Sequence, residues 1–377
     1  MQNSPHDISL VFIELGAAIG GLGILARIAS RWGFSSVPLY LLGGLAFGNG
    51  GLLPLDLSQS FIRIGGEIGV LLLLFMLGLE YTGAELREHL HGGLPAGGMD
   101  FLLNFLPGLA AGRLFGWSWL AAFVLGGVTW VSSSGVIAKV LGELKRLGNP
   151  ETPTILTVLV LEDLAMAVYL PLITALLSGG SAAQLVVSVS VALTVVAVAL
   201  VIAFRYGRKV SGWVSHESDE VVLLTTLAIV LLLAGLAQRV QVSAAVAAFL
   251  AGVALSGPIA EKSRRILAPL RDLFAAIFFF FFGLEIAPAS LPPVAMQAVG
   301  LGLITALTKV ATGYFAARRA GMDGRGRWRA GISLIARGEF SIIIAGFGAV
   351  VEPQLGPLSA AYVLLLAIVG PILARLV

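Results

Sequence analysis

Cysteine is absent from this chain of 377 residues, and charged residues and histidine are scarce. Without cysteine the protein forms no disulfides and offers no thiolate ligands to a metal. Only 12% of the residues are charged, about half the share found in soluble domains, whereas 58% are hydrophobic. The four histidines, His6, His89, His91 and His216, fall in the N-terminal tail or in predicted loops, so neither a histidine metal centre nor a histidine proton relay is expected. The formal net charge of +3 is too small to indicate binding to nucleic acid.

Long apolar runs fill most of the sequence and predict an all-α polytopic membrane protein. Continuously apolar segments such as 185–203 and 221–233 argue against a transmembrane β-barrel, whose strands alternate every second residue. At roughly 20 residues per crossing, about 13 transmembrane helices fit. The expected spans are 8–29, 35–50, 61–81, 94–115, 119–141, 152–178, 182–204, 219–237, 241–256, 268–286, 290–317, 329–350 and 356–376. Little chain remains between them, so we expect a single transmembrane domain, 1–377, without a soluble regulatory domain.

Basic residues are distributed unevenly over the loops that join these spans. With the N-terminus outside, most of the 24 lysines and arginines fall on the cytoplasmic side. The outer side holds only Arg63, Arg113 and Arg239. By the positive-inside rule, this asymmetry predicts an outside N-terminus and a cytoplasmic C-terminus. The first seven residues carry no lysine or arginine, so we expect the first apolar stretch to be a retained helix rather than a cleaved signal peptide.

Matching motifs recur in the two halves of the chain. The Gly-rich segment around Gly44 resembles that around Gly252, the third and tenth spans both end in Gly-Leu-Glu, and a polar interruption at Ser133 matches one at Gly338. The three pairs follow one another in order, seven spans apart, which predicts an inverted-topology repeat. The expected parts are repeat 1 at 8–178, a linker helix at 182–204 and repeat 2 at 219–376. Such repeats are typical of secondary transporters, whose site lies near the bilayer midplane.

Two adjacent acids, Glu162 and Asp163, lie in the middle of the span 152–178 without a local cation. An ionised group at this depth costs at least a few kcal/mol, so it needs a partner, water or a function. A carboxylate there can bind a proton or a small monovalent cation, but hardly both at once. Lys309 is the expected counter-ion, mainly for Glu162, and Glu67 can reach the same cavity as a further ligand or proton carrier. The alternative is a purely structural pair anchored to Lys309.

Polar residues and glycine also interrupt the spans 119–141 and 329–350. The first interruption contains Thr129, Ser132, Ser133 and Ser134, and the second contains Arg337, Gly338 and Glu339. We expect both helices to break at mid-membrane and to expose carbonyls and half-helix dipoles there. For the first span, close helix packing by small residues is the alternative. Arg337 and Glu339 are expected to satisfy each other or neighbouring helix ends as structural support.

Several of these motifs occur together in a known family. They are Val37–Gly44, Glu67–Gly69, Phe75–Glu80, Ser132–Gly135, Leu161–Asp163, Phe249–Gly252, Leu270–Phe274, Phe282–Gly283 and Arg337–Phe340. With them the chain resembles the membrane domain of the monovalent cation:proton antiporter-2 (CPA2) family, which includes Kef-type potassium efflux systems and bacterial sodium/proton exchangers. The resemblance implies a sodium/proton-antiporter-like fold, a homodimer in a bacterial-type inner membrane, and Asp163 as the exchange site facing Lys309. It also implies elevator-like sliding of a mobile core formed by the spans 94–178 and 290–376.

The sequence thus predicts a transporter, not an enzyme, that exchanges K⁺ or Na⁺ for H⁺ without a cofactor. The monovalent cation is expected at Asp163, with Thr129 and Ser132–Ser134 completing its shell. If Glu162 stays locked to Lys309, exchange is electroneutral; if Glu162 also titrates, two protons move per cation. In the family the position of Glu162 is often Asp in sodium exchangers and Gln in Kef-type proteins, so the cation and the stoichiometry stay open.

The chain also departs from Kef-type proteins, which commonly carry a C-terminal nucleotide-binding domain. Either regulation needs a separate cytoplasmic subunit, or this sequence is the membrane portion of a longer protein. Three alternative functions stay open: a gated potassium channel-like protein, a sodium-coupled organic-anion symporter of related fold, and a membrane-embedded hydrolase.

Overall fold

The computed structural model describes residues 8–32, 35–48, 51, 59–79, 83–177, 182–239, 244–255, 257–284 and 286–377. The tail of residues 1–7 lies outside this description. Within these ranges the chain forms fifteen α-helices and two short 3-10 helices, and no strand occurs among the described residues. The all-α prediction is confirmed.

The first half of the chain contains α1 to α8. They are α1 (Ile8–Trp32), α2 (Val37–Phe47), α3 (Gln59–Gly78), α4 (Gly83–Leu114), α5 (Trp119–Trp130), α6 (Ser134–Glu143), α7 (Thr152–Leu177) and α8 (Ala182–Val214). The second half contains α9 (Asp219–Arg239), α10 (Ala244–Ala254), α11 (Pro258–Leu284), η1 (Pro288–Ser290), η2 (Pro292–Val294), α12 (Ala295–Arg319), α13 (Gly324–Ser333), α14 (Glu339–Gly348) and α15 (Leu355–Leu376).

Six segments of the described chain are long and apolar enough to cross a membrane. They are Trp119–Glu143, Thr152–Leu170, Asp219–Arg239, Pro258–Leu284, Pro288–Arg319 and Leu355–Leu376. Shorter apolar helices include Val37–Phe47 and Ile64–Met76. The chain is therefore a multi-pass helical protein, while the count of about 13 crossings stays a prediction.

Several helices extend beyond the apolar spans expected from the sequence. The span expected at 94–115 belongs to α4, which begins at Gly83, and the linker span expected at 182–204 continues in α8 to Val214. The span expected at 268–286 lies in α11, which begins at Pro258. The backbone hydrogen bonds of a helix form whether or not its side chains are apolar. Hydropathy therefore marks the membrane-crossing part of a helix rather than its ends.

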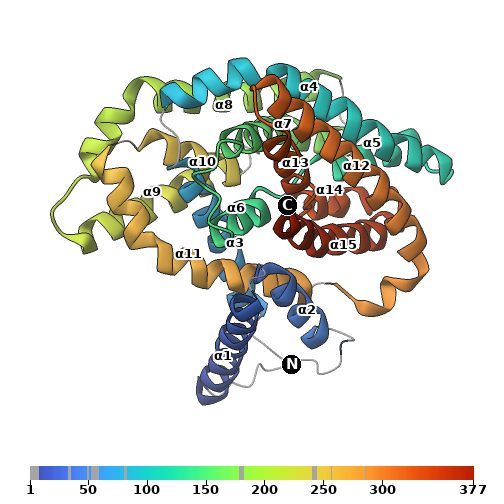
Figure 1. Cartoon of the computed structure of the whole chain (residues 1–377), viewed down its shortest axis with the longest axis horizontal. Coiled ribbons are helices and arrows are strands. Elements are labelled where there is room, and N and C mark those ends of the chain that lie inside the picture. Colours follow the sequence, from blue (N-terminus) through green and yellow to red (C-terminus); the bar gives the residue numbers. More distant parts are fainter. Residues whose placement is uncertain are drawn as a thin grey trace.

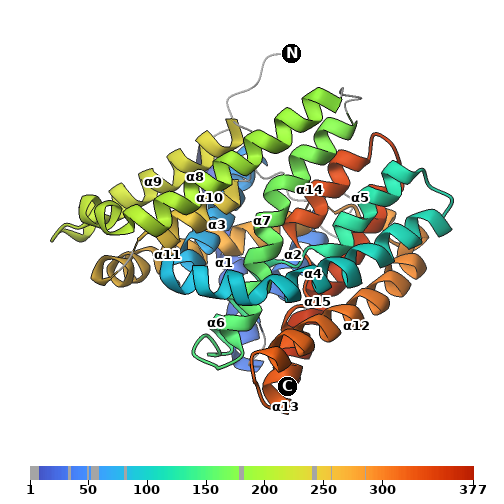
Figure 2. The ribbon, with the colours of Figure 1, turned by 90° about the horizontal axis from the view of Figure 1, so that it is seen from above.

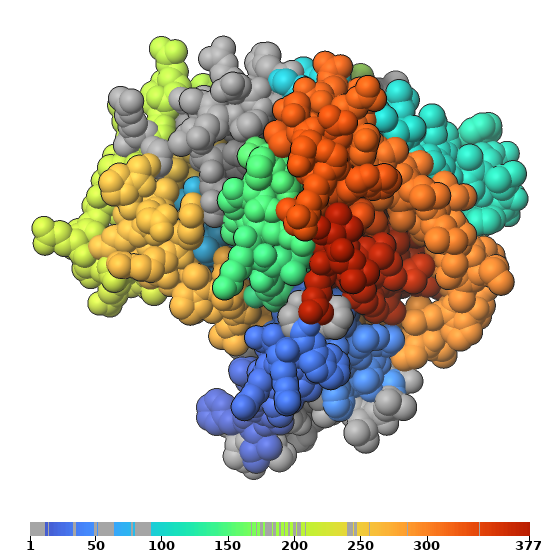
Figure 3. Space-filling model, viewed as in Figure 1, coloured from blue at the N-terminus to red at the C-terminus, as the bar shows by residue number. Residues whose placement is uncertain are grey.

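The helices pack in two groups, which lie on opposite sides of the molecule (Figure 1). The frame helices are α1, α2, α3, α9, α10 and α11, and the core helices are α4, α5, α6, α7, α12, α13, α14 and α15. The view from above shows the same division (Figure 2). The long helix α8 packs against both α7 of the core and α10 of the frame. The short α6 contacts both groups, packing on α2 and α3 of the frame and on α15 of the core. On the face shown in Figure 3, α6 lies beside α15 and α1 projects from the frame.

Two pairs of frame helices cross so closely that only glycine fits at the contact. A methyl group on Gly44 of α2 would lie 2.8 Å from the Cα of Gly283 in α11. A methyl group on Gly78 of α3 would lie 3.0 Å from the Cα of Gly252 in α10. The sequence motifs relate α2 to α10 and α3 to α11. The crossing of α2 with α11 therefore corresponds to the crossing of α10 with α3, so that each crossing pairs one helix from each half of the chain. An inverted repeat predicts such an exchange of partners, and the repeat itself stays a prediction.

Candidate functional site

Two core helices are interrupted, and the interruptions touch each other. Residues 131–133 separate α5 from α6, and residues 334–338 separate α13 from α14. The backbone N–H of Ser133 donates a hydrogen bond of 2.9 Å to the carbonyl of Ala336. A methyl group on Gly338 would lie 2.6 Å from the Cβ of Ser133, so the close approach requires glycine there. Four half-helix ends therefore meet at one point inside the core helices.

Arg337 binds backbone carbonyls at this crossing. Its side chain is fully buried, and its guanidinium donates to the carbonyls of Thr129 (3.1 Å), Leu334 (3.2 Å) and Ile335 (3.0 Å) and to the hydroxyl of Tyr362 (3.0 Å). These carbonyls lie at the carboxyl ends of α5 and α13, where helices leave acceptors unsatisfied and carry partial negative charge. Arg337 thus acts on neighbouring helix ends, one of the two roles expected from the sequence.

The two adjacent acids of α7 lie beside the same crossing. Glu162 and Asp163 are 2% and 4% exposed. Glu162 accepts hydrogen bonds from the backbone N–H and the hydroxyl of Ser132, the latter at 3.1 Å. Asp163 accepts a hydrogen bond of 2.8 Å from the hydroxyl of Ser134, at the amino end of α6. The first broken helix therefore presents donors and a positive half-helix end to both carboxylates.

Lys309, in the middle of α12, is fully buried and binds two carboxylates. Its Nζ lies 2.7 Å from Oε1 of Glu162, the counter-ion expected from the sequence. It also lies 2.6 Å from Oδ1 of Asp100 on α4. Both distances are those of strong, charge-assisted hydrogen bonds. One ammonium group therefore serves two buried acids.

Asp100 was not singled out by the sequence analysis. It is fully buried, and besides Lys309 it accepts hydrogen bonds from Asn104 Nδ2 and Trp130 Nε1, each 3.0 Å long. Asn104 in turn accepts a hydrogen bond of 2.8 Å from Thr308, one residue before Lys309. The signal available in the sequence was an aspartate inside the apolar span 94–115. Such an intramembrane acid is by default a functional candidate.

The remaining site residues expected from the sequence have different positions. Ser133 caps α6 by accepting a hydrogen bond of 3.2 Å from the backbone N–H of Val136. The hydroxyl of Thr129 donates to the carbonyl of Asn104 at 2.8 Å, so it faces α4. Glu67 is exposed on the frame helix α3. The side chain of Glu339 lies outside the described part of the structure.

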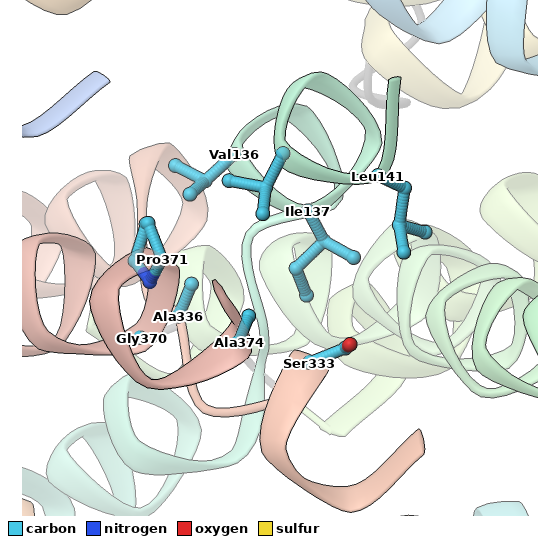
Figure 4. A pocket seen from close by; sticks show the side chains of 9 residues that line it. Val136, Ile137, Leu141, Ser333, Ala336, Gly370, Pro371 and Ala374 are labelled. Atoms are coloured by element: carbon cyan, nitrogen blue, oxygen red, sulfur yellow. The ribbon is translucent and has the colours of Figure 1, made fainter. Parts of the chain in front are cut away.

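A small cavity adjoins the crossing on the side of α6 and α15 (Figure 4). Its wall includes Val136 and Ile137 of α6, Ala336 of the second interruption and Pro371 of α15, and it has room for at most about one water molecule. Only Ser333 contributes a side-chain oxygen to this wall. A cation needs several oxygen ligands. The acids of α7 are therefore the better candidate site.

The described residues contain no group of three or more histidine, aspartate or glutamate side chains placed to hold a resident metal ion. The chemistry that the site offers is that of a single carboxylate, Asp163, next to hydroxyl and carbonyl oxygens. Carboxylate and neutral oxygen ligands suit hard cations and protons.

Comparison with known proteins gives matches along nearly the whole chain. The family model for "Sodium/hydrogen exchanger, transmembrane" matches residues 15–376. The chain is 34% identical to the K⁺/H⁺ antiporter subunit KhtU of Bacillus subtilis (strain 168), over 97% of this chain and 93% of that protein. It is 31% identical to the ammonium/H⁺ antiporter subunit AmhT of Alkalihalophilus pseudofirmus, over 78% and 76%. The fold matches that of the sodium proton antiporter MjNhaP1 from Methanocaldococcus jannaschii with a TM-score of 0.74, covering 98% and 100% of the two chains at 16% identity.

Proposed function

The chain belongs to the sodium/hydrogen exchanger family, and from this premise we propose that it exchanges K⁺ or Na⁺ for H⁺ across a membrane. Proteins similar to it are antiporters of cations and protons and not enzymes. Their substrates differ, since one relative is a K⁺/H⁺ antiporter and another is a high-affinity Na⁺/H⁺ antiporter. The cation is therefore a matter for direct measurement.

The observation that carries the proposal is the buried carboxylate of Asp163 at the crossing of the two interrupted helices. The monovalent cation binds there when the carboxylate is ionised, and a proton binds there otherwise. Because the cation and the proton neutralise the same carboxylate, the binding of one excludes the other. Ser132, Ser133 and Ser134 complete the cation shell through hydroxyl or carbonyl oxygens. Thr129, whose hydroxyl bonds to the carbonyl of Asn104 and whose carbonyl bonds to Arg337, would have to release one of these bonds to join it.

Alternating access follows from the division into frame helices and core helices. The core helices carry Asp163 and slide against the frame like an elevator, so that the site opens first to one side and then to the other. Counting α5 with α6 and α13 with α14 as single crossings gives about 13 spans, with an outside N-terminus and a cytoplasmic C-terminus. Glu67, exposed on the frame helix α3, is the further ligand or proton carrier that we propose this movement brings to the cavity.

The proposed partners are a second copy of the chain and a separate regulatory subunit. Two relatives are described as subunits of antiporters. At the proposed cytoplasmic end, Arg146 donates a hydrogen bond of 2.7 Å to the carbonyl of Ala374 in α15. Burial lowers the pKa of Arg146, and the charge of Arg329 lowers it further. This basic end of the core is where we place the regulatory contact.

The test is proton flux in proteoliposomes, followed with a pH-sensitive dye after addition of K⁺, Na⁺ or NH₄⁺. The unmodified protein should move protons in response to at least K⁺ or Na⁺, and Asp163→Asn should abolish this flux. Asp219→Asn provides the matched control, since the same chemical change falls on an exposed side chain of α9. Undiminished flux in Asp163→Asn would reject the site. A cation current without proton movement would favour a channel instead.

A further inference from the structure

The turn between α12 and α13 is rich in arginine and contains no lysine. It directly follows the apolar segment Pro288–Arg319, at the end of α12 that we propose to be cytoplasmic. Figure 2 places α13 at the same edge of the molecule as α6 and the C-terminal end. The positive-inside rule by itself accounts for basic residues at such a place, so their number alone indicates no ligand. The arginines of residues 318–329 are Arg318, Arg319, Arg325, Arg327 and Arg329.

These arginines differ from the other basic residues at this side in how few of them are paired. On α11, Lys262 and Arg265 both form ion pairs with Asp219, at 3.0 Å and 3.8 Å. At the α12–α13 turn, the ion pair found among the described residues is that of Arg329 with Glu151, at 3.8 Å. The charge of the turn is therefore largely uncompensated by the part of the chain that the structure describes.

The single acid within residues 318–329 is used by the backbone. Asp323 accepts a hydrogen bond of 2.7 Å from the backbone N–H of Gly326 and so caps the amino end of α13. Arg318, Arg319 and Arg325, which we call the turn arginines, are exposed and form no ion pair with a described acid. They are free to bind an anion from outside the chain.

Aromatic side chains lie next to the turn. The rings of Tyr314 and Trp328 meet edge to face with their centroids 5.4 Å apart, although they come from different helices. Trp328 is 52% exposed. The guanidinium of Arg327 lies 5.9 Å from the ring of Tyr314, and that of Arg319 lies 5.8 Å from the ring of Phe315. Half-exposed aromatic rings at the end of an apolar span are typical of the depth at which lipid headgroups meet acyl chains.

Arg329 does not belong to this surface. It follows Trp328 on α13 but donates a hydrogen bond of 3.0 Å to the carbonyl of Val377 beyond α15. The turn arginines and the Tyr314–Trp328 pair are therefore separate from the contact that we propose for a regulatory subunit near Arg146. In Figure 3 the end of α12 and the start of α13 form a continuous surface.

We propose that this surface binds the headgroup of an anionic phospholipid of the cytoplasmic leaflet. The guanidinium groups of the turn arginines bind phosphate oxygens, for which their planar pair of donors is suited. The Tyr314–Trp328 pair packs against the glycerol and the first part of an acyl chain. Basic clusters directly cytoplasmic of a membrane helix attract anionic lipids in this way. An acidic protein would satisfy the arginines equally, but it would leave the exposed Trp328 without an apolar partner.

A bound lipid would hold one end of the core helices at the level of the headgroups. Since α12 and α13 belong to the core, any sliding of the core would have to carry the lipid along or release it. This consequence rests on the proposed function. The lipid site itself does not, because it is tested by binding rather than by transport.

The test measures lipid binding to the whole chain in a neutral detergent by native mass spectrometry, with phosphatidylglycerol and phosphatidylcholine as probes. Phosphatidylglycerol should bind more tightly. Substitution of all three turn arginines by glutamine should raise its dissociation constant about a hundredfold, since each arginine near a headgroup contributes about fivefold. Equal affinity for the two lipids would overturn the proposal and favour an acidic protein as the partner of the turn.

A matched control removes the same charge elsewhere. Lys262→Gln, Arg265→Gln and Arg271→Gln together remove three positive charges from α11, where each base has an aspartate partner. This triple variant should change the dissociation constant of phosphatidylglycerol less than about threefold. A loss as large as that of the turn variant would show a general effect of net charge and would overturn the site.

Two further measurements identify the ligand as a lipid. Trp328→Ala keeps every charge, so it should weaken both lipids about fivefold and preserve the preference for phosphatidylglycerol. Unchanged binding of both lipids would remove the aromatic pair from the site. Inorganic phosphate and glycerol phosphate have no acyl chains and should fail to displace phosphatidylglycerol. Displacement by either of them would overturn the assignment to a lipid in favour of a soluble phosphate.

Discussion

Glu143, at the carboxyl end of α6, accepts a hydrogen bond of 2.7 Å from the hydroxyl of Ser36 at the start of α2. The backbone N–H of Ser36 donates to the same carboxylate at 3.2 Å. Four residues earlier on α6, Lys139 pairs with Asp272 of α11 at 3.0 Å. These bonds join the helix that presents Ser134 to Asp163 with two helices of the frame. They would have to break for the proposed sliding of the core.

Removing this connection should loosen α6. In Glu143→Ala, Ser36 loses its acceptor, and we expect a cost of about 1 kcal/mol, because the carboxylate is partly exposed. Amide hydrogen exchange in α6 should become about fivefold faster, since local opening costs less free energy. Glu352→Ala is the control, because Glu352 lies in the short link before α15 and bonds only locally, to the backbone N–H of Gln354. Equal exchange rates in α6 of both variants would contradict this role.

Loss of Arg337 should destabilise the crossing strongly. Arg337→Met leaves the carbonyls of Thr129 and Ile335 without this donor, whereas the carbonyl of Leu334 keeps the hydroxyl of Ser132; each buried carbonyl left unsatisfied costs about 1–3 kcal/mol. The midpoint of thermal unfolding in detergent should fall well below that of Tyr362→Phe, which removes a single hydroxyl from the same network. A smaller effect for Arg337→Met than for Tyr362→Phe would show that water or other donors already serve these carbonyls.

Bulk at the close crossing of α3 and α10 should also destabilise the fold. A methyl group at Gly78 would meet the backbone of Phe249 and Gly252, which cannot rotate away, so Gly78→Ala should cost about 1–3 kcal/mol. Gly235→Ala is the matched control, because nothing lies within 4 Å of the added methyl group on α9. There the stability should rise slightly, by about 0.5 kcal/mol, since alanine favours helix. Thermal unfolding of the two variants gives the comparison.

The hydroxyl of Ser134 should tune cation binding. Ser134→Ala removes the donor that lies 2.8 Å from Asp163, and with it an oxygen of the proposed shell. We expect the cation concentration for half-maximal exchange to rise about threefold to tenfold. The free energy of unfolding should fall by about 1–3 kcal/mol, because the buried carboxylate of Asp163 loses a donor. Ser359→Ala is the control, since this buried serine of α15 has no hydrogen-bond partner among the described residues. Similar transport in the two variants would remove Ser134 from the site.

Much of the candidate site could be predicted from the sequence, because charged residues are easily recognised within long apolar spans. Glu162 and Asp163 interrupt an apolar run, and Lys309 interrupts another, so each stands out without any knowledge of packing. In the structure Glu162 and Asp163 bond to the first interruption, and Lys309 bonds to Glu162. Asp100 was equally visible as an acid in an apolar span, but nothing along the chain indicated which helix it faces.

The sequence by itself determined that this chain is helical and spans a membrane many times, and it predicts a repeat with inverted direction. These properties depend on the order of apolar and polar residues, which is local along the chain. Only the tertiary structure decided that Lys309 binds two acids, that Arg337 serves carbonyls of both interrupted helices, and that Gly44 faces Gly283. Such contacts join residues far apart in sequence, and which helix faces meet is settled by packing between helices rather than by hydropathy.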